Sequence, residues 1–241
     1  YILGFVLYGT TVLLPVLMQT LMGYSAMQSG LVLLPGGALM IAILPIVGIL
    51  LGKFEARWLV VVGLAITASG LFMMAHFDLQ MGMWTPISVW IVSRVGVAFL
   101  FVPINVIAFY FVAPKKTNDA TGLINLARNI GGSMGISFVT TLLDRGAQKH
   151  QNILSGHITA LSNNFQNQMH ALAQRLIAAG SNPVEALHQA EKMFYGVIQQ
   201  QAMMLSFIDD FRIMGYVCLG MIPVMFILKR ASPGKSRVIA H

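Results

Sequence analysis

Residues 15–57 read PVLMQTLMGYSAMQSGLVLLPGGALMIAILPIVGILLGKFEAR. The stretch contains the end of one apolar segment, a short uncharged link at 23–27, a second apolar segment at 28–51 and a basic link at 53–57. A helix needs about 20 mostly apolar residues to cross the hydrocarbon core of a bilayer. The stretch therefore predicts one membrane-spanning helix, a tight turn and a second membrane-spanning helix.

The same pattern recurs along the chain. Six segments are long and apolar enough to span: 1–22, 28–51, 58–77, 87–112, 120–143 and 208–228. The composition agrees, because 56% of the residues are hydrophobic and only 10% are charged, whereas soluble domains have about 25% charged residues. We predict an all-α membrane protein with a bundle of six transmembrane helices.

Basic residues mark alternate links between these segments. They are Lys53, Arg57, Lys115, Lys116, Lys229, Arg230, Lys235 and Arg237, whereas the links at 23–27 and 78–86 contain no Lys or Arg. Basic links lie on the cytoplasmic side of membranes, so both ends of the chain are expected in the cytoplasm. The orientation of the chain in the membrane thus accounts for its excess of basic residues and its net charge of +7. We therefore expect no nucleic-acid partner. Trp58, Trp84 and Trp90 fall at or near segment ends, as in an aromatic belt.

The predicted organisation has four parts. Residues 1–143 hold the first five spans, 144–207 form a long polar outer loop, 208–230 form the last span and 231–241 form a cytoplasmic tail. In the loop, helix formers end at Gly180, a plausible C-cap. A second helix then begins with Asn182 as N-cap, Pro183 at the first helical position and Glu185 three residues after the cap. We expect a helical hairpin whose second arm continues into the last span. The chain opens inside an apolar segment without an initiator Met, so we interpret it as a fragment of a longer protein.

Arg128 lies in the fifth apolar segment. At 100° per residue it shares a helix face with Asn125, Asn129, Gly132 and Ile136. An arginine at the centre of a membrane helix costs about 2.5–3.5 kcal/mol on insertion scales. We expect this face to look into the bundle interior or a water-filled cavity. Snorkelling to the cytoplasmic surface, or a purely structural pairing, is the alternative.

Arg94 repeats the pattern in the fourth segment, on one face with Ala98, Phe101 and Asn105. Two arginines with asparagines nearby, on consecutive helices, predict a polar passage, because ionisable groups inside membranes are functional candidates. A structural role in holding helices together is the alternative for each arginine.

The sequence GGSMG at 131–135 matches the G-x-S-x-G nucleophile elbow with Ser133 as nucleophile, but that motif works on a strand–turn–helix. We favour helix packing, in which Gly131 and Gly135 let a neighbouring helix approach closely. Asp209 and Asp210 at the outer end of the last span are candidates for a proton relay, although an interfacial pair with Arg212 is more common.

A zinc site is a further alternative for the outer loop. It would use His150, His157, His170 and His188, but their spacings are not those of a compact zinc motif. No metal or cofactor is expected. The single cysteine, Cys218, excludes an intrachain disulfide and any multi-cysteine metal site.

The stretch at 15–57 resembles the major facilitator superfamily, and more narrowly its fourteen-span drug:proton antiporters of the EmrB/QacA type. At the turn between the first and second helices, the residues that match the family's pattern are Gln19, Gly23, Tyr24, Ser25, Ala26, Gly30 and Pro35. The segment GILLGKFEAR resembles the C-terminal copy of the superfamily's loop motif through Gly48, Lys53, Glu55 and Arg57, which makes these four residues gating candidates. The aspartate that the stricter motif places early in this loop is missing. GLINLARNIGGSMG resembles the family's glycine-rich penultimate helix, with Gly131, Gly132 and Gly135 as packing residues.

The resemblance implies that the chain is the C-terminal six-helix half of a proton-coupled exporter of drugs or other amphiphilic molecules in the bacterial inner membrane. Its partners would be the missing N-terminal half, small amphiphilic substrates and protons. Some Gram-negative relatives also work with a periplasmic adaptor and an outer-membrane channel, which makes these candidate partners. The pathway candidates are Gln19, Arg94, Asn105, Asn125, Arg128 and Asn129. The rival interpretations are an exporter of a siderophore or metabolite, a membrane enzyme, and a non-transporting scaffold or sensor.

Overall fold

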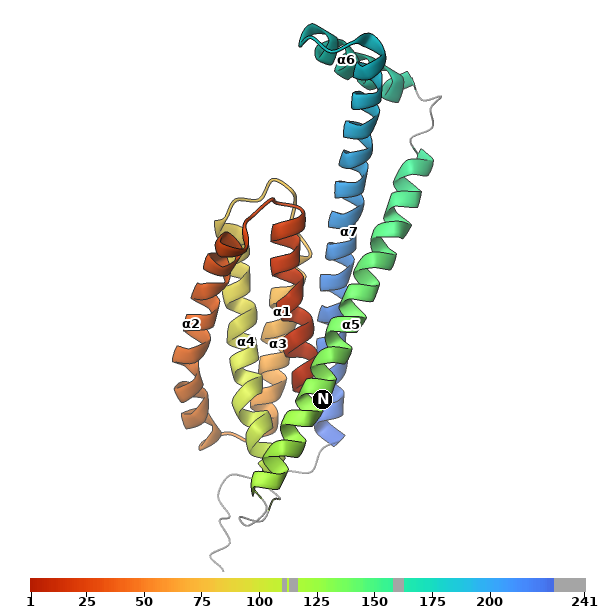
Figure 1. The fold of residues 1–241 in the computed structure, drawn as a ribbon. Helices are drawn as coiled ribbons and strands as arrows, with labels where there is room; N and C mark the ends of the chain where they lie inside the picture. The colour runs from red at the N-terminus through yellow and green to blue at the C-terminus, as the bar shows by residue number, and fades with distance from the viewer. Residues whose placement is uncertain (110–111, 113–116, 158–162, 228–241) are drawn as a thin grey trace, which may run out of the picture. The chain divides into compact units, whose positions relative to one another are not determined.

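A computed structural model describes residues 1–109, 112, 117–157 and 163–227. All regular structure in these residues is helical, as predicted. The helices are α1 (Ile2–Thr20), α2 (Ala26–Leu51), α3 (Ala56–Met74), α4 (Trp84–Phe109), α5 (Thr117–His157), α6 (Asn163–Ala178) and α7 (Pro183–Ile227) (Figure 1). The predicted basic residues Lys115, Lys116, Lys229, Arg230, Lys235 and Arg237 lie outside the described residues.

The chain divides into two compact units. The first comprises Tyr1–Thr140 and Ile208–His241, and the second comprises Thr141–Phe207. Helices α5 and α7 each contribute residues to both units.

Four helices of the first unit match the predicted spans within a few residues. Helices α1, α2, α3 and α4 are long and apolar enough to cross a membrane. The fifth and sixth spans, at 120–143 and 208–228, fall within the longer helices α5 and α7. Their crossing of the membrane stays a prediction.

The turn between α1 and α2 follows from local chemistry. Gly23 has a φ of 68°, a left-handed conformation that glycine adopts without steric cost. Ser25 is the N-cap of α2 and forms a capping box with Gln28, in which each side chain accepts a hydrogen bond from the other residue's backbone N–H. These residues stop one helix and start the next within a few residues.

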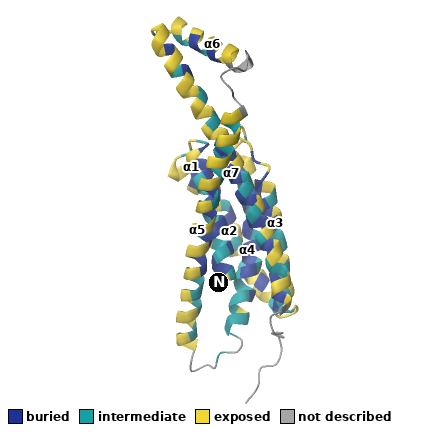
Figure 2. Cartoon of the chain, turned by 90° about the vertical axis from the view of Figure 1, so that its right-hand side faces the viewer, coloured by how far each residue is buried: buried dark blue, intermediate teal, exposed yellow. Residues whose placement is uncertain are grey.

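Close packing in the first unit depends on small residues between α3 and α4. A Cβ built on Gly63 would lie 2.9 Å from the carbonyl oxygen of Gly96, and one on Gly70 would lie 3.0 Å from the Ser93 backbone. The fully buried Thr67 hydroxyl donates to the Gly63 carbonyl oxygen at 2.8 Å. Figure 2 shows the buried residues concentrated among α1, α3 and α4, while α5 carries an exposed side. Helix α2 buries only Ser29, Val32, Gly36 and Val47.

Helix α5 is longer than predicted. The fifth span was expected to end at 143, but the helix continues to His157. Residues 144–157 lose the apolar character that marks a span, yet they contain no proline, so the backbone hydrogen bonds continue. Within the second unit this extension packs on α7, where the buried Ser206 hydroxyl donates to the Leu143 carbonyl oxygen at 2.7 Å.

The predicted helical hairpin is present in the second unit. Helix α6 ends at Ala178, and Gly180 follows with a φ of 102°. The Asn182 side chain accepts from the Val184 N–H at 3.2 Å, and α7 begins at Pro183. Met169 and Ala173 of α6 and Ala190 of α7 form the small buried core of this hairpin. Its second arm continues without a break through α7 to Ile227.

Candidate functional site

Arg94 lies where α1, α2 and α4 meet. Its side chain is 5% exposed. Nη1 donates to the Thr11 hydroxyl at 3.0 Å, and Nη2 donates to the Thr10 hydroxyl at 3.4 Å. The guanidinium carbon lies 3.8 Å from the centre of the Trp90 ring, within the range of a cation–π interaction. The Trp90 indole N–H in turn donates to the Leu33 carbonyl oxygen of α2 at 3.1 Å.

The two threonines are oriented to accept these bonds. The Thr10 hydroxyl donates to the Val6 carbonyl oxygen at 2.7 Å, and the Thr11 hydroxyl donates to the Leu7 carbonyl oxygen at 2.5 Å. Since each hydroxyl proton is used within α1, the hydroxyl lone pairs remain for Arg94. The guanidinium group is thus held by neutral acceptors and an aromatic ring. Within the described residues, its Nε has no hydrogen-bond partner.

Arg94 also lies deep along its helix. It follows Trp84, the first residue of α4, by ten positions, which is roughly 15 Å at the rise of an α-helix. That is about half the thickness of a hydrocarbon core. The aromatic-belt interpretation of Trp90 is wrong, because its side chain is 3% exposed and lies inside the helix bundle.

Arg128 joins α5 to α4. Its Nη2 donates to the Asn105 Oδ1 at 2.7 Å, and its guanidinium carbon lies 5.3 Å from the centre of the Phe101 ring. Asn105 is itself oriented, because its Nδ2 donates to the Phe101 carbonyl oxygen at 2.6 Å. Arg128 and Asn105 are half-buried. The structure therefore brings together two residues that the sequence placed on separate helices.

The other pathway candidates do not join these contacts. Asn125 and Asn129 are exposed, because the buried face of α5 is centred on its glycines and not on the asparagines. Gln19 is exposed at the C-terminal end of α1, nine positions beyond Thr10, or roughly 13 Å along the helix.

The glycines of α5 lie against α1. A Cβ built on Gly135 would lie 2.6 Å from the Phe5 carbonyl oxygen, and one on Gly132 would lie 2.5 Å from the Tyr8 ring. A Cβ on Gly131 would clash with the carbonyl oxygen of Tyr1, and one on Gly4 would clash with that of Arg128. These glycines permit the two backbones to approach closely.

The loop-motif candidates lie at the link between α2 and α3. Gly48 is in α2 with nothing within 4 Å of a built Cβ, and Lys53 is exposed in the turn. Glu55 occupies the N-cap position of α3, although no side-chain cap bond forms there. Arg57 is half-buried in the first turn of α3.

Two alternative sites are not supported by the local structure. Ser133 is exposed in the middle of α5 and donates to the Ile130 carbonyl oxygen at 3.0 Å, so the strand–turn–helix of a nucleophile elbow is absent at this position. Across the described residues, no three His, Cys, Asp or Glu side chains form a group that could hold a metal ion. The side chain of His157 is not among those that the structure describes.

The two aspartates of the last span differ. Asp209 lies 3.9 Å from Arg212 in a half-exposed pair, the common interfacial arrangement. Asp210 is only 1% exposed, so it does not have the interfacial environment that the sequence suggested for both.

Comparison with known protein families identifies a match over the first part of the chain. The family model described as Major Facilitator Superfamily matches residues 1–136. The chain is 30% identical over 167 residues to the multidrug export protein EmrB of Escherichia coli, covering 68% of this chain and 32% of that protein. It is 28% identical over 228 residues to the fatty acid resistance protein FarB of Neisseria gonorrhoeae, covering 94% of this chain and 43% of that protein.

A third relative is the colistin resistance protein EmrB of Acinetobacter baumannii. The identity is 25% over 221 residues, which cover 90% of this chain and 42% of that protein. The aligned part of the chain therefore spans from 32% to 43% of the length of these relatives.

Proposed function

The chain belongs to the major facilitator superfamily, and from this premise we propose that it is the C-terminal six-helix half of a proton-coupled exporter. Its substrates would be drugs or other amphiphilic small molecules, and its location the bacterial inner membrane. The relatives' names, which refer to multidrug export, fatty acid resistance and colistin resistance, support this choice of substrates.

The observation that carries the proposal is the Arg128–Asn105 pair. An arginine within a membrane helix is costly, and the described residues give Arg128 a single hydrogen bond, to the neutral Asn105. A guanidinium group has five N–H donors. The remaining donors are available to a substrate, to water or to the rest of the protein, which suits a residue on a transport route better than a structural ion pair.

Alternating access would require a second helical bundle. The relatives are more than twice as long as the aligned region, and we propose that the additional length supplies the N-terminal half. Exposed apolar residues on α2, including Leu31, Leu34 and Ile41, are available for contact with that half or with lipid. Substrate would bind between the halves near the bilayer midplane, as in other transporter folds.

Proton coupling is proposed to depend mainly on the N-terminal half. From α1 to residue 140 of α5 the only acidic residues are Glu55, Asp78 and Asp119, and these lie in links or at a helix start. A periplasmic adaptor and an outer-membrane channel are further partners that we propose for a Gram-negative host.

The test uses the full-length protein that carries this chain, reconstituted in liposomes with an imposed pH gradient. We expect Arg128→Leu to reach the membrane normally, because the change removes an insertion cost and leaves no carboxylate unpaired, but to lose at least about tenfold in the rate of dye export. Arg145→Leu, a change at an exposed arginine of the same helix, should leave both quantities unchanged. Normal export by Arg128→Leu would contradict the proposal, and export that does not respond to the pH gradient would contradict proton coupling.

A further inference from the structure

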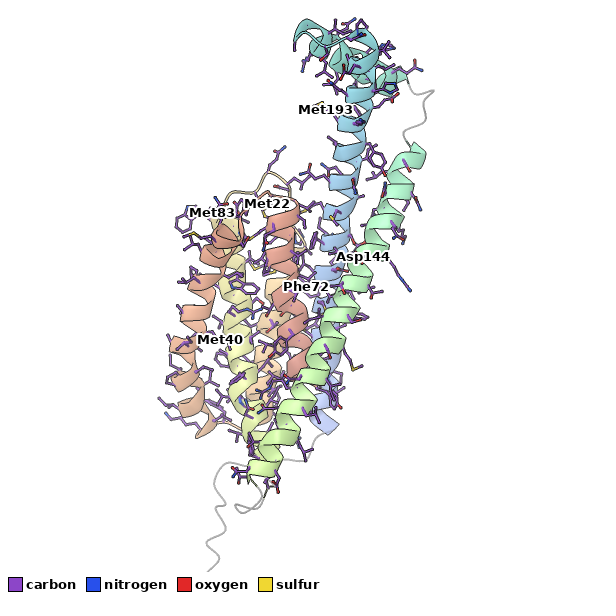
Figure 3. All side chains as sticks on the ribbon, viewed as in Figure 1. Met22, Met40, Phe72, Met83, Asp144 and Met193 are labelled. Atoms are coloured by element: carbon purple, nitrogen blue, oxygen red, sulfur yellow. The ribbon has the colours of Figure 1, made fainter. Side chains whose placement is uncertain are left out.

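A cavity of about 260 Å³ lies between α5 and α7 within the second unit. Four polar side chains line it: Asp144, Gln148 and Gln151 from α5, and Gln199 from α7. Ala147, Ala202 and Met203 supply the apolar part of the wall. Figure 3 labels Asp144 on the stretch of α5 that runs beside α7.

Helical spacing explains why these residues face one space. On α5 the lining positions are 144, 147, 148 and 151, and on α7 they are 199, 202 and 203. Residues three, four and seven apart lie on one face of a helix. Each helix therefore presents one continuous face to the cavity.

Contacts at both ends hold the two helices around this space. At one end Ser206 bonds to the Leu143 carbonyl oxygen at 2.7 Å, and Gly146 permits this approach because a Cβ there would clash with the Ser206 hydroxyl. At the other end the Gln151 Nε2 donates to the Tyr195 hydroxyl at 2.6 Å. Between these contacts the side chains of Ala147 and Ala202 are too small to fill the gap.

The charge of the lining is negative. Asp144 is its only charged side chain, and within the described residues this carboxylate has no ion-pair partner. Arg145 and Lys149 are close in sequence but do not line the cavity. The glutamine side chains add amide oxygens, which accept hydrogen bonds from a charged donor.

We propose that this cavity binds a small organic cation. Its protonated amine would contact Asp144 and the glutamine oxygens, and its apolar portion would contact Ala147, Ala202 and Met203. The predicted topology places the site on the outer side of the membrane. This proposal does not rest on the proposed transport function. The cation site can therefore be wrong while the transport function holds, and the reverse.

Cysteine reactivity tests the charge preference. Gln148 is exposed, whereas the native Cys218 is buried, so Gln148→Cys adds one accessible thiol to the chain. It is made in full-length protein in detergent, with accessible cysteines outside this chain replaced. The rates of modification by a trimethylammonium-ethyl and a sulfonatoethyl methanethiosulfonate are compared. We expect Asp144→Asn to lower the cation-to-anion rate ratio by up to roughly 30-fold, because the carboxylate attracts one reagent and repels the other by about 1 kcal/mol each at 4 Å in water. Asp119→Asn, at an exposed acid near the start of α5, should leave the ratio unchanged, and an unchanged ratio in Asp144→Asn would overturn the proposal.

Protection of the same thiol tests binding. Benzylamine should slow its modification, and uncharged benzyl alcohol should not. Ala147→Ile, which fills the cavity, should abolish the protection. Equal protection by both compounds, or protection by calcium chloride but not by benzylamine, would overturn the organic-cation site.

Discussion

The contact between α1 and α5 makes a quantitative prediction for Gly135→Ala. The new Cβ would lie 2.6 Å from the Phe5 carbonyl oxygen and 3.0 Å from the Phe5 Cα. Carbon atoms pack best at about 3.5–4.0 Å, so the two helices would have to separate by roughly 0.5–1 Å. Overpacking of this kind costs about 1–3 kcal/mol.

Gly122→Ala provides the matched control on the same helix. Nothing lies within 4 Å of a Cβ built on Gly122, so alanine there gives only the gain in helix propensity, up to about 1 kcal/mol. The same gain applies at Gly135, and it cancels when the two variants are compared. The difference between them is therefore the packing cost alone.

The measurement is the midpoint of thermal unfolding of the full-length protein in one detergent. We expect Gly135→Ala to unfold at least about 1 °C below Gly122→Ala, since 1 kcal/mol shifts the midpoint by about 2–4 °C in proteins of 150–250 residues and by about half as much in a protein twice as long. Equal midpoints would show that α1 and α5 are not in backbone contact at Gly135, and the packing role given to the α5 glycines would be wrong.

Four further substitutions test other parts of the structure and its predicted topology. Ser25→Ala removes the capping box of α2 and should cost about 1 kcal/mol, measurable as a lower midpoint of thermal unfolding. Trp90→Phe removes the hydrogen bond to the Leu33 carbonyl oxygen and should destabilise by about 0.5–1.5 kcal/mol; a midpoint at or above that of the unchanged protein would contradict this contact. A cysteine in place of Gln166 should react with an impermeant thiol reagent only from outside, and one in place of Lys115 only from the cytoplasm, so reversed labelling at either position would refute the six-span topology.

The apolar runs predicted the first four helices well because hydrophobic length is what a membrane span requires. The apolar runs did not predict the end of α5, because the end of an apolar run marks the end of a predicted span and not the end of a helix. Apolarity stops at Leu143, but a helix stops only where a backbone breaker or a competing contact ends it, and the helix continues to His157. Gly180 and Asn182, by contrast, act on the backbone directly, so the sequence located the hairpin turn.

The sequence identified Arg94, Asn105 and Arg128 as candidates, but it did not predict which residues these side chains contact. Arg128 was identified from its cost inside a membrane helix, and Asn105 from its position on the same helix face as Arg94. The bond between Arg128 and Asn105 depends on the register of α4 against α5, which the sequence does not encode locally. Thr10 and Thr11 were missed because a threonine in a helix ordinarily bonds only to its own preceding turn. Their adjacency at the middle of the first span was the available signal.

The position of Trp90 has a consequence for spectroscopy. Trp58 is 56% exposed and Trp84 is 81% exposed, whereas Trp90 is 3% exposed with a guanidinium group against its ring. If Trp58 and Trp84 are replaced by phenylalanine, the remaining indole emission from this chain comes from the point where α1, α2 and α4 meet. A change in that emission during turnover would report directly on whether Arg94 leaves its aromatic neighbour, without attaching any probe to the protein.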